Sequence, residues 1–503
     1  MLKRLFAAVL ATLCITGCGE STDSSQTVNE SSLAETSESI NITDTETETV
    51  VVLSEDGITV DGEMISADAS KAVYISNDII YYESGKDASY GEGTEADAHS
   101  AEEANAHSVV NIAKAGTYRI KGNLPKGQIF VDLGDDAEND KNAVVTLILD
   151  NADISCSVAP AIFFYNVYEC GKKDETKATA TVDTSAAGAN VIIADDSINT
   201  VSGAYVARIY KPGTTDKLHK YDGAFYSKRS MNIDGEEKGN GVLHINATNE
   251  GLDSELHLTV NGGEITISSQ NDGINTNEDN ISVTTINGGK LTINAGLGAE
   301  GDGIDSNGYI VINGGEILAS SCDKGPDGGI DADKLIIING GIVIACGNQN
   351  GAVSPDSKQQ FMQTMLTESV AANSIVKVLS GRLDSSKDLI NFTAIKSFTS
   401  LVLSCPEFED GHSYSITANG KEITYSFTSG FFPGIGAPDG MQPPFGGQRP
   451  EGGRFSEMPT VPEGLDEWLS ETEIPDDIRA WIEGMKEFSQ DFGNRGGARS
   501  PMI

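Results

Sequence analysis

Acidic and amide side chains recur in one short motif along the middle of the chain. Each copy joins an acid, a glycine, an apolar residue and a second Asp or Asn, and copies begin at Glu250, Asp272, Asp302 and, with one extra glycine, Asp327. A weaker copy begins at Asp222. Several oxygen ligands at a flexible turn suit Ca²⁺ better than other common metals. The alternative is that these residues only form turns, which Asp, Asn and Gly do readily.

A second group of residues combines positive charge with aromatic rings. The candidates for carbohydrate contact are Arg208, Tyr210, Tyr221, Tyr226, Lys228 and Arg229. Aromatic rings stack on sugar rings, and Arg binds carboxylates through paired hydrogen bonds. An acidic polysaccharide such as polygalacturonate fits both features and could share the calcium. The alternative is that the charges only offset an acidic protein, while the aromatic residues lie in its core.

The elements that must position these residues repeat at a fixed interval. The triplet Asn-Gly-Gly recurs at a step of 26 residues, at 261–263, 287–289, 313–315 and 339–341. A period of this length is typical of solenoid proteins. After each triplet alternate residues are apolar, which is the pattern of a strand with one buried face. We therefore predict an all-β fold, a parallel β-helix with about 26 residues per regular coil.

Stacking of the coils gives the acidic motif its chemical meaning. Equivalent residues of neighbouring coils in such a fold lie about 4.8 Å apart, the spacing of paired strands. Carboxylates at that separation repel one another unless they are protonated or bridged by a cation. The repeated motif therefore predicts at least one bound Ca²⁺ ion.

The two ends of the chain differ from this middle part. Residues 1–17 have a basic start, an apolar core and a lipobox-like end before Cys18, which predicts a lipoprotein signal peptide and lipidation of Cys18. Residues 18–49 are rich in Ser, Thr and Glu and predict a disordered tether. We expect a lipid-anchored protein on the extracellular face of a bacterial membrane.

The remaining chain divides into a folded domain and a tail. We expect the β-helix, with an N-terminal cap, over residues 50–430, and a Gly- and Pro-rich tail with a short amphipathic helix over 431–503. In the last coils Leu318, Ile342 and Ile344 are apolar at outward positions and need a cover. The segment Ser357 to Ala372 has apolar residues at helical spacing, so we predict a helix there.

Charge and motifs exclude several functions. The net charge of −41 excludes nucleic acid as a partner, since phosphate binding needs a basic surface. The chain has no Gly-x-Ser-x-Gly, His-Glu-x-x-His or phosphate-loop motif. A polyuronate lyase needs calcium and a base such as Arg208 or Arg229, but no motif pairs either with an acid cluster.

The run of motifs from 222 to 307, together with the Asn-Gly-Gly triplets and the segment Ser404 to Tyr414, resembles a bacterial family of carbohydrate-binding β-helix proteins. The resemblance covers about 50–427. It implies a right-handed parallel β-helix similar to pectate lyases, with calcium in its turns and binding of cellulose or acidic plant polysaccharides without cleavage. The calcium ligands that it implies are Asp253, Asp272, Asn275, Asp302, Asp305 and Asp331. The glycine inserted at 328–329 departs from the family pattern just before Asp331.

These observations predict a surface-anchored, calcium-binding, non-catalytic protein that binds an acidic polysaccharide such as polygalacturonate, or cellulose. Two alternatives remain: a calcium-dependent polysaccharide lyase that uses the same surface, and a structural surface adhesin whose partner is another protein.

Overall fold

The computed structural model describes residues 48–380, 387–409, 412, 414–423 and 425–427. Within these residues the chain is mostly β, with one short α-helix, α1 (Ala101–Asn105), and two 3-10 helices, η1 (Ala137–Asn139) and η2 (Glu175–Lys177). None of the helices in the described part is long and apolar enough to span a membrane. The predicted signal peptide, Cys18, residues 18–47 of the predicted tether and the predicted tail over 431–503 lie outside the described residues.

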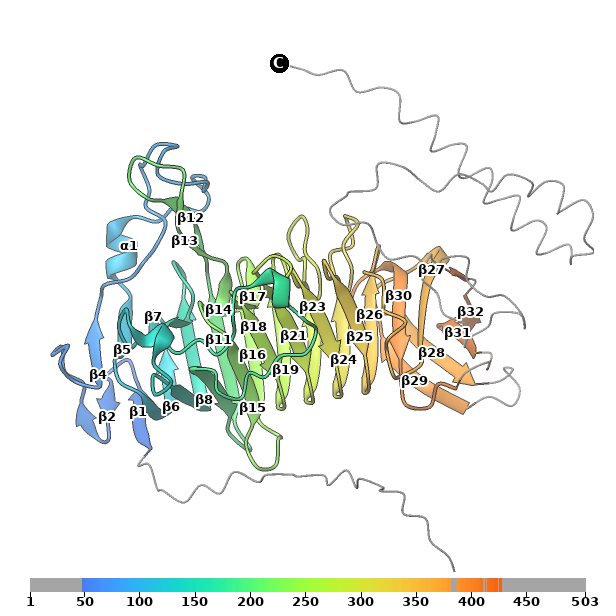
Figure 1. The fold of residues 1–503 in the computed structure, drawn as a ribbon, viewed down its shortest axis with the longest axis horizontal. Helices are drawn as coiled ribbons and strands as arrows, with labels where there is room; N and C mark the ends of the chain where they lie inside the picture. The colour runs from blue at the N-terminus through green and yellow to red at the C-terminus, as the bar shows by residue number, and fades with distance from the viewer. Residues whose placement is uncertain (1–47, 381–386, 410–411, 413, 424, 428–503) are drawn as a thin grey trace, which may run out of the picture. The chain divides into compact units, whose positions relative to one another are not determined.

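Three rows of parallel strands make up most of the structure, and Figure 1 shows successive strands stacked side by side along the long axis. The first row is β1 (Thr49–Leu53), β6 (Gly116–Leu124), β8 (Val145–Cys156), β10 (Ala189–Ile193), β15 (Met231–Gly235), β18 (His257–Val260), β21 (Val283–Ile286), β23 (Tyr309–Ile312) and β25 (Leu335–Ile338). The second row starts from β8 and continues through β11 (Ile198–Gly203), β16 (Val242–Ala247), β19 (Glu264–Ser269), β22 (Lys290–Asn294), β24 (Glu316–Ser320) and β26 (Ile342–Gly347). The third row is β5 (Ser108–Ile112), β7 (Gly127–Asp132), β9 (Ile162–Asn166), β14 (Gly223–Ser227), β17 (Glu250–Ser254) and β20 (Ile274–Thr276), with β4 (Val73–Ser76) antiparallel at its start. Of the predicted parallel β-helix, this arrangement confirms a mostly β fold with a long parallel sheet.

The register of the second row confirms the predicted repeat. Glu264 lies opposite Lys290, and Lys290 lies opposite Glu316, so successive strands are offset by 26 residues. Their neighbours Leu291 and Ile317 are 1% and 0% exposed. Each strand therefore directs alternate side chains into one shared core, as the apolar pattern predicted.

The Asn-Gly-Gly triplets form the turns between the first and second rows. The last glycine of each triplet has a positive φ, for example +87° at Gly263 and +89° at Gly315, which favours glycine. The asparagines form a ladder in which Asn287 donates a hydrogen bond to Asn261, and Asn313 to Asn287, each at 2.8 Å. The triplets therefore join the coils through the turns as well as through the strands.

At the C-terminal end of the stack, the prediction of a helix in the segment Ser357 to Ala372 is wrong. The segment forms a strand, β27 (Phe361–Val370), which pairs with β30 (Phe398–Ser404), and β30 pairs antiparallel with β26. Ile344 belongs to the second hydrophobic core that these strands help to form, and Leu318 and Ile342 are partly buried and pack against that core. A strand occupies this place because β30, which pairs with β26 along one edge, would otherwise leave its other edge unpaired. A strand satisfies those backbone groups, whereas a helix cannot.

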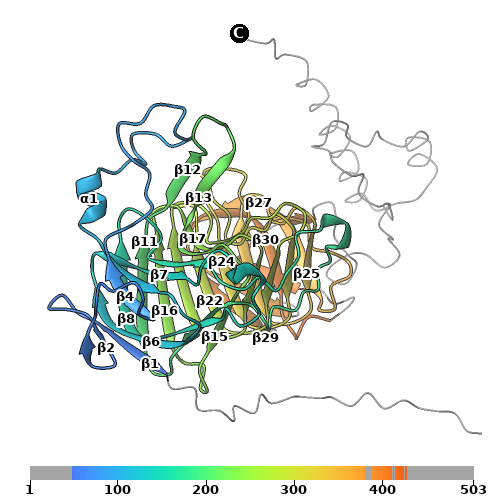
Figure 2. The same cartoon turned by 60° about the vertical axis from the view of Figure 1, so that its left-hand side comes forward.

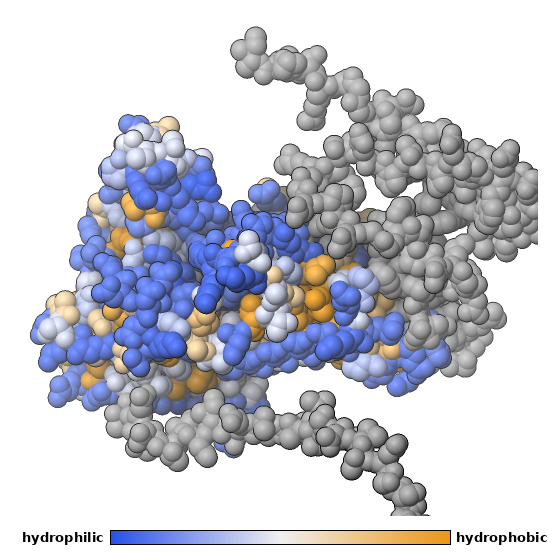
Figure 3. Space-filling view, viewed as in Figure 1, coloured by the Kyte–Doolittle hydropathy of each residue, from blue (hydrophilic) through white to orange (hydrophobic). Residues whose placement is uncertain are grey.

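Two smaller antiparallel units accompany the rows. The strands β28 (Ile375–Ser380), β29 (Lys387–Thr393), β31 (Tyr414–Ala418) and β32 (Lys421–Glu422) form a separate sheet near the C-terminal end. The hairpin of β12 (Val206–Tyr210) and β13 (Lys217–Tyr221) lies beside the loop that precedes α1, which both views show (Figures 1 and 2). Figure 3 shows a largely hydrophilic face, with hydrophobic residues gathered over β21 to β25.

Candidate metal centre and carbohydrate surface

The third row carries the acidic motif and aligns its outward side chains. Leu252 and Ile274, which are fully buried, point into the core, so the residues after them point outward. Asp253 lies opposite Tyr226 on one side and opposite Asn275 on the other. The three residues therefore form one outward column across β14, β17 and β20.

Isolated bridges extend this column beyond the last regular strand. Ile274 pairs with Ile304, and Ile304 pairs with Ile330. Asp305 and Asp331 follow these two isoleucines in the chain, and the backbone N–H of Asp331 donates to the Ile304 carbonyl at 2.9 Å. The glycine inserted at 328–329 is thus absorbed before Ile330, and Asp331 keeps its place in the column.

A first acidic cluster brings together Asp222, Glu250 and Asp253, whose carboxylate oxygens lie within 4.8 Å of one another. All three residues are buried, at 5%, 4% and 0% exposure. Glu250 Oε2 and Asp253 Oδ2 are buried atoms without a hydrogen-bond partner. Lys220 Nζ lies 2.6 Å from Asp222 Oδ2, so one positive charge faces three acids.

The electrostatics of the first cluster disfavour three free carboxylates. Burial raises the pKa of Glu250 well above its usual value, and the charges of Asp253 and Asp222 raise it further. Burial also raises the pKa of Asp253 well above its usual value, together with the charges of Asp222 and Glu255. Such groups either hold protons at neutral pH or share a cation. Because two of their oxygens have no hydrogen bond to satisfy them, the residues fit a metal ion.

A second acidic cluster lies farther along the column and consists of Asp302, Asp305 and Asp331, again within 4.8 Å. Burial raises the pKa of Asp302 to about 8, with added repulsion from Asp272 and Asp331. Burial likewise raises the pKa of Asp305 to about 8, with repulsion from Asp272, Asp302 and Asp331. The cluster therefore also offers oxygen ligands whose charges oppose one another.

Asp272 and Asn275, which belong to the predicted ligand set, lie outside both clusters. Asp272 Oδ1 accepts a hydrogen bond from the Asp302 backbone N–H at 2.6 Å, so this acid joins neighbouring coils. Asn275 Oδ1 is buried without a hydrogen-bond partner, and its column neighbours are Asp253 and Asp305. Asn275 is therefore placed to add a neutral oxygen to either cluster.

The predicted ligand set omitted Asp222 and Glu250. Both begin copies of the acidic motif, so the motif itself held the signal that could have identified them. The four predicted acids Asp253, Asp302, Asp305 and Asp331 do meet in the two clusters.

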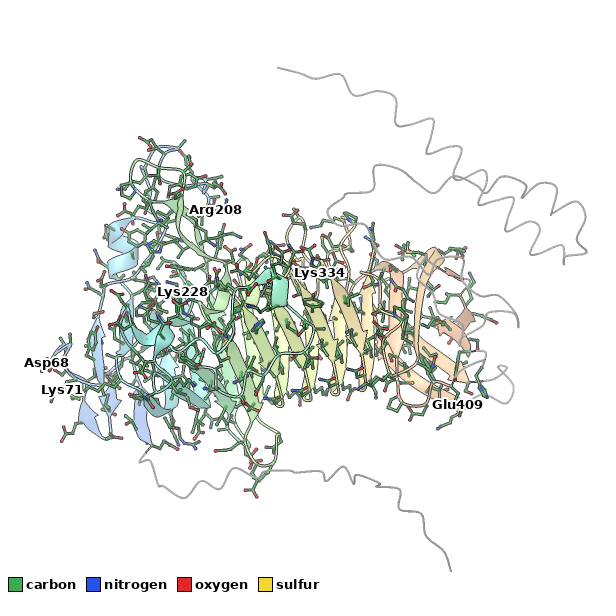
Figure 4. The ribbon with its side chains drawn as sticks, in the orientation of Figure 1. Asp68, Lys71, Arg208, Lys228, Lys334 and Glu409 are labelled. Carbon is green, nitrogen blue, oxygen red and sulfur yellow. The ribbon has the colours of Figure 1, made fainter. Side chains whose placement is uncertain are left out.

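The predicted carbohydrate residues divide into two places, and Figure 4 labels Arg208 and Lys228 apart from each other. Lys228 follows β14, and its Nζ lies 3.9 Å from the centroid of the Tyr165 ring. Arg229 forms an ion pair with Glu138 at 2.7 Å. Arg208 and Tyr210, on β12, both bind Glu92 Oε1, at 2.9 and 2.7 Å.

Burial changes the part that two of the predicted aromatic residues can play. Tyr221 is 3% exposed and Tyr226 is 0% exposed. A buried ring offers no face to a sugar, so these two rings can only support the surface. Phe163 packs edge-on against both, with ring centroids 4.6 and 5.2 Å away.

Two rings that reach the surface near Lys228 were not among the predicted residues. Phe130 and Tyr165 are half-buried, and their ring centroids lie 5.3 Å apart with planes tilted by 32°. Both rings belong to the third row. Phe130 is on β7 at an outward position opposite Phe163, and Tyr165 comes two residues after Phe163 on β9. Short aromatic runs in the sequence could have identified these two rings, but the runs lie far along the chain from the basic residues and were not linked to them.

The family assignment follows from a comparison with known families. A family model described as carbohydrate-binding domain-containing protein matches residues 106–400, which is more than half of the chain. The chain belongs to this family. The match includes both acidic clusters, the Asn-Gly-Gly turns and the Lys228 region, so the carbohydrate-binding domain is the part that carries the site.

Two individual proteins are similar to the chain. A carbohydrate-binding domain-containing protein from Acetivibrio thermocellus is 28% identical over 161 residues, which is 32% of this chain and 45% of that relative. The match thus spans less than half of the relative's length. The structure of a polysaccharide lyase-like protein from C. thermocellum, solved as a gadolinium derivative, is 18% identical and has a TM-score of 0.33, covering 62% of this chain and 92% of that one. At this TM-score the likeness supports no inference about function.

Proposed function

We propose that this protein is a non-catalytic, calcium-dependent polysaccharide-binding protein. Its ligand is an acidic plant polysaccharide such as polygalacturonate, or cellulose. A lipid on Cys18 anchors it to the extracellular face of a bacterial membrane. Membership of the carbohydrate-binding domain family supports the general function, and the acidic clusters support the role of a metal ion.

The observation that carries the proposal is the pair of unpartnered carboxylate oxygens on Glu250 and Asp253. Buried acids without hydrogen bonds are costly unless a cation balances them. A set made only of oxygen donors matches the preference of Ca²⁺. We assign Asp222, Glu250 and Asp253 to one ion and Asp302, Asp305 and Asp331 to another.

The proposed architecture is a right-handed parallel β-helix. Three rows of parallel strands with a 26-residue offset support a coil that contributes one strand or bridge to each row. In such a coil the third row forms one continuous outward surface, and that surface holds both acidic clusters.

The sugar surface lies next to the first cluster on the same row. Asp253 lies opposite Tyr226 of β14, and Lys228 comes directly after the end of that strand. A calcium ion at the first cluster would bind one carboxylate of a uronate chain while Lys228 binds another, and Phe130 and Tyr165 would offer faces for stacking. A surface with both a metal and a lysine favours acidic sugars over neutral ones.

Retention of the mature protein on polygalacturonate, with calcium and with chelator, tests the proposal. We expect binding in calcium and its loss in EDTA, without absorbance from unsaturated products. Equal retention in both conditions would contradict the role of the metal.

One observation favours a lyase as the second candidate. Lys220 stands beside the first acidic cluster, where a base would be needed to remove a proton from a calcium-bound uronate. The charges of Asp222, Glu250 and Asp253 raise the pKa of Lys220 against the effect of burial. A calcium ion that balanced these acids would remove this effect, so Lys220 could act as the base only with the metal bound. Rising ultraviolet absorbance that disappears in Lys220→Ala would establish the lyase instead.

A further inference from the structure

A cavity separate from the acidic clusters lies between residues 79–90 and the β12–β13 hairpin. Its volume is about 580 Å³, within the range of pockets that hold small organic ligands. Three tyrosines line it, Tyr81, Tyr90 and Tyr210, together with His219 and the aliphatic side chain of Leu218. All of the aromatic rings are half-buried, so each keeps a surface toward the cavity.

The backbone fixes the two walls of this cavity to each other. The Tyr210 N–H donates to the Tyr90 carbonyl at 2.8 Å, and the Glu92 N–H donates to the Arg208 carbonyl at 2.9 Å. Gly91 sits at the crossing, where a Cβ atom would lie 1.9 Å from the Arg208 carbonyl oxygen. The close approach therefore needs glycine, and the cavity is built into the fold. Figure 2 shows the hairpin beside the loop.

The charges around the cavity disfavour an anionic ligand. Lys86 forms an ion pair with Glu83 at 2.7 Å, so its charge is already balanced. Asp87 adds a further negative charge to the same wall. Burial lowers the pKa of His219, which keeps the imidazole neutral at neutral pH. An acidic sugar would meet net repulsion here, unlike at Lys228.

We propose that this cavity is a second carbohydrate site, which binds a neutral saccharide through stacking on Tyr81, Tyr90 and Tyr210 and needs no metal. The rings match the apolar C–H faces of a pyranose, while tyrosine hydroxyls and His219 at the wall serve its hydroxyl groups. The proposal rests on the proposed carbohydrate-binding function but not on calcium. The protein then has one site for an acidic saccharide and a second site for a neutral one.

Calorimetry of the full chain in EDTA tests the proposal with three neutral probes, cellohexaose, xylohexaose and mannohexaose. We expect at least one of them to bind, and Tyr81→Ala to weaken that binding by about tenfold through loss of one stacked ring. Tyr81→Phe keeps the ring but removes its hydroxyl group, and it should lose much less affinity than Tyr81→Ala. Tyr74→Ala removes a half-buried tyrosine outside the cavity and is the matched control.

Two results would overturn the second site: no binding of any neutral probe in EDTA, or Tyr81→Ala that binds as tightly as the unaltered protein. If Tyr81→Ala fails to fold, Leu218→Asp gives the same test, because Leu218 is 45% exposed and tolerates a polar residue. Hexagalacturonate in calcium separates the two proposals. If a neutral probe binds and hexagalacturonate does not, the second site stands and the acidic-sugar function is rejected. If hexagalacturonate binds and no neutral probe does, the acidic-sugar function stands and the second site is rejected.

Discussion

Tyr226 and Asp253 lie directly opposite each other on the parallel strands β14 and β17. On one side of this pair the outward column continues through Phe163 and Phe130, and on the other side through Asn275. The column therefore changes from aromatic to acidic within one strand spacing, about 4.8 Å.

The same pair explains why the acids of the first cluster are buried rather than exposed to solvent. Tyr226 is fully buried, and its hydroxyl group donates to Glu255 and lies 3.1 Å from the Lys220 carbonyl oxygen. The ring closes one side of the first cluster, so Asp253 is shielded from water on that side. The shielding raises the pKa of Asp253, so a bound cation would stabilise the folded state more.

Removal of calcium is expected to destabilise the protein through the first cluster. With calcium at a concentration well above its dissociation constant, we expect the melting temperature to rise by about 5 °C over that in EDTA. In Asp253→Asn the calcium-induced rise should shrink, and stability in EDTA should equal or exceed that of the unaltered protein because one repulsive charge is gone. Differential scanning calorimetry in both conditions measures this.

Asp216→Asn is the matched control for that experiment, because Asp216 is an exposed acid of the hairpin. It should leave both melting temperatures unchanged. A melting curve of the unaltered protein that is the same in calcium and in EDTA would reject a structural metal.

The stability of the metal-free protein should fall as the pH rises from about 4 to about 8. The pKa values of Asp302 and Asp305 are raised from 3.8 to about 8, so the folded state binds more protons than the unfolded state in this window. The free energy of unfolding then decreases as the pH increases. Calcium should reduce this loss, because the cation stabilises the ionised carboxylates.

A variant isolates this contribution from the rest of the protein. His257 acts in the opposite direction between about pH 4 and 6.5, because burial lowers its pKa to about 4. We therefore compare urea unfolding of the unaltered protein and Asp305→Asn in EDTA at several pH values. The advantage of the variant should grow with pH, and an advantage that stays constant from pH 4 to 8 would contradict the raised pKa of Asp305.

The regular coils could be predicted from the sequence because local signals repeat there without interruption. The Asn-Gly-Gly turns and the apolar alternation keep one 26-residue step, and the strand register follows the same step. The third row has no such constancy: 22 residues separate Asp253 from Asn275, and 30 separate Asn275 from Asp305. Loop lengths absorb the difference, which is why the motif identified several acids but not their grouping.

Contacts between distant segments escaped prediction for a related reason. Gly91 pairs with Ile209 only because the fold returns the hairpin to the N-terminal loop, and no local pattern near either residue indicates it. Likewise, the apolar spacing of Phe361, Met365 and Leu366 predicted a helix, but the segment forms a strand because it pairs with β30, which in turn pairs with β26. In both places tertiary pairing outweighed local preference.

Gly315→Ala should destabilise the stack more than a matched glycine substitution elsewhere. Gly315 has a φ of +89°, and a Cβ atom would lie 2.9 Å from the Gly289 carbonyl oxygen of the neighbouring coil. Gly62 has a similar φ of +83° but open space around it. Gly62→Ala should cost about 1 kcal/mol from backbone strain, and Gly315→Ala at least about 1 kcal/mol more. Equal losses in urea unfolding would show that the turns do not pack against one another.

Lys228→Ala should weaken polygalacturonate binding more than Arg229→Ala. Lys228 lies over the half-buried Tyr165 ring and forms no ion pair within the described residues, whereas Arg229 is already paired with Glu138 at 2.7 Å. A paired cation gains less free energy from binding a uronate, because its existing ion pair must first break. We expect about a tenfold loss of affinity for Lys228→Ala and about a twofold loss for Arg229→Ala, measured by calorimetry with hexagalacturonate in calcium. Lys228→Arg keeps the charge and should retain most of the affinity, so a loss as large as that of Lys228→Ala would show that the ring contact of the lysine, rather than its charge, supports this surface.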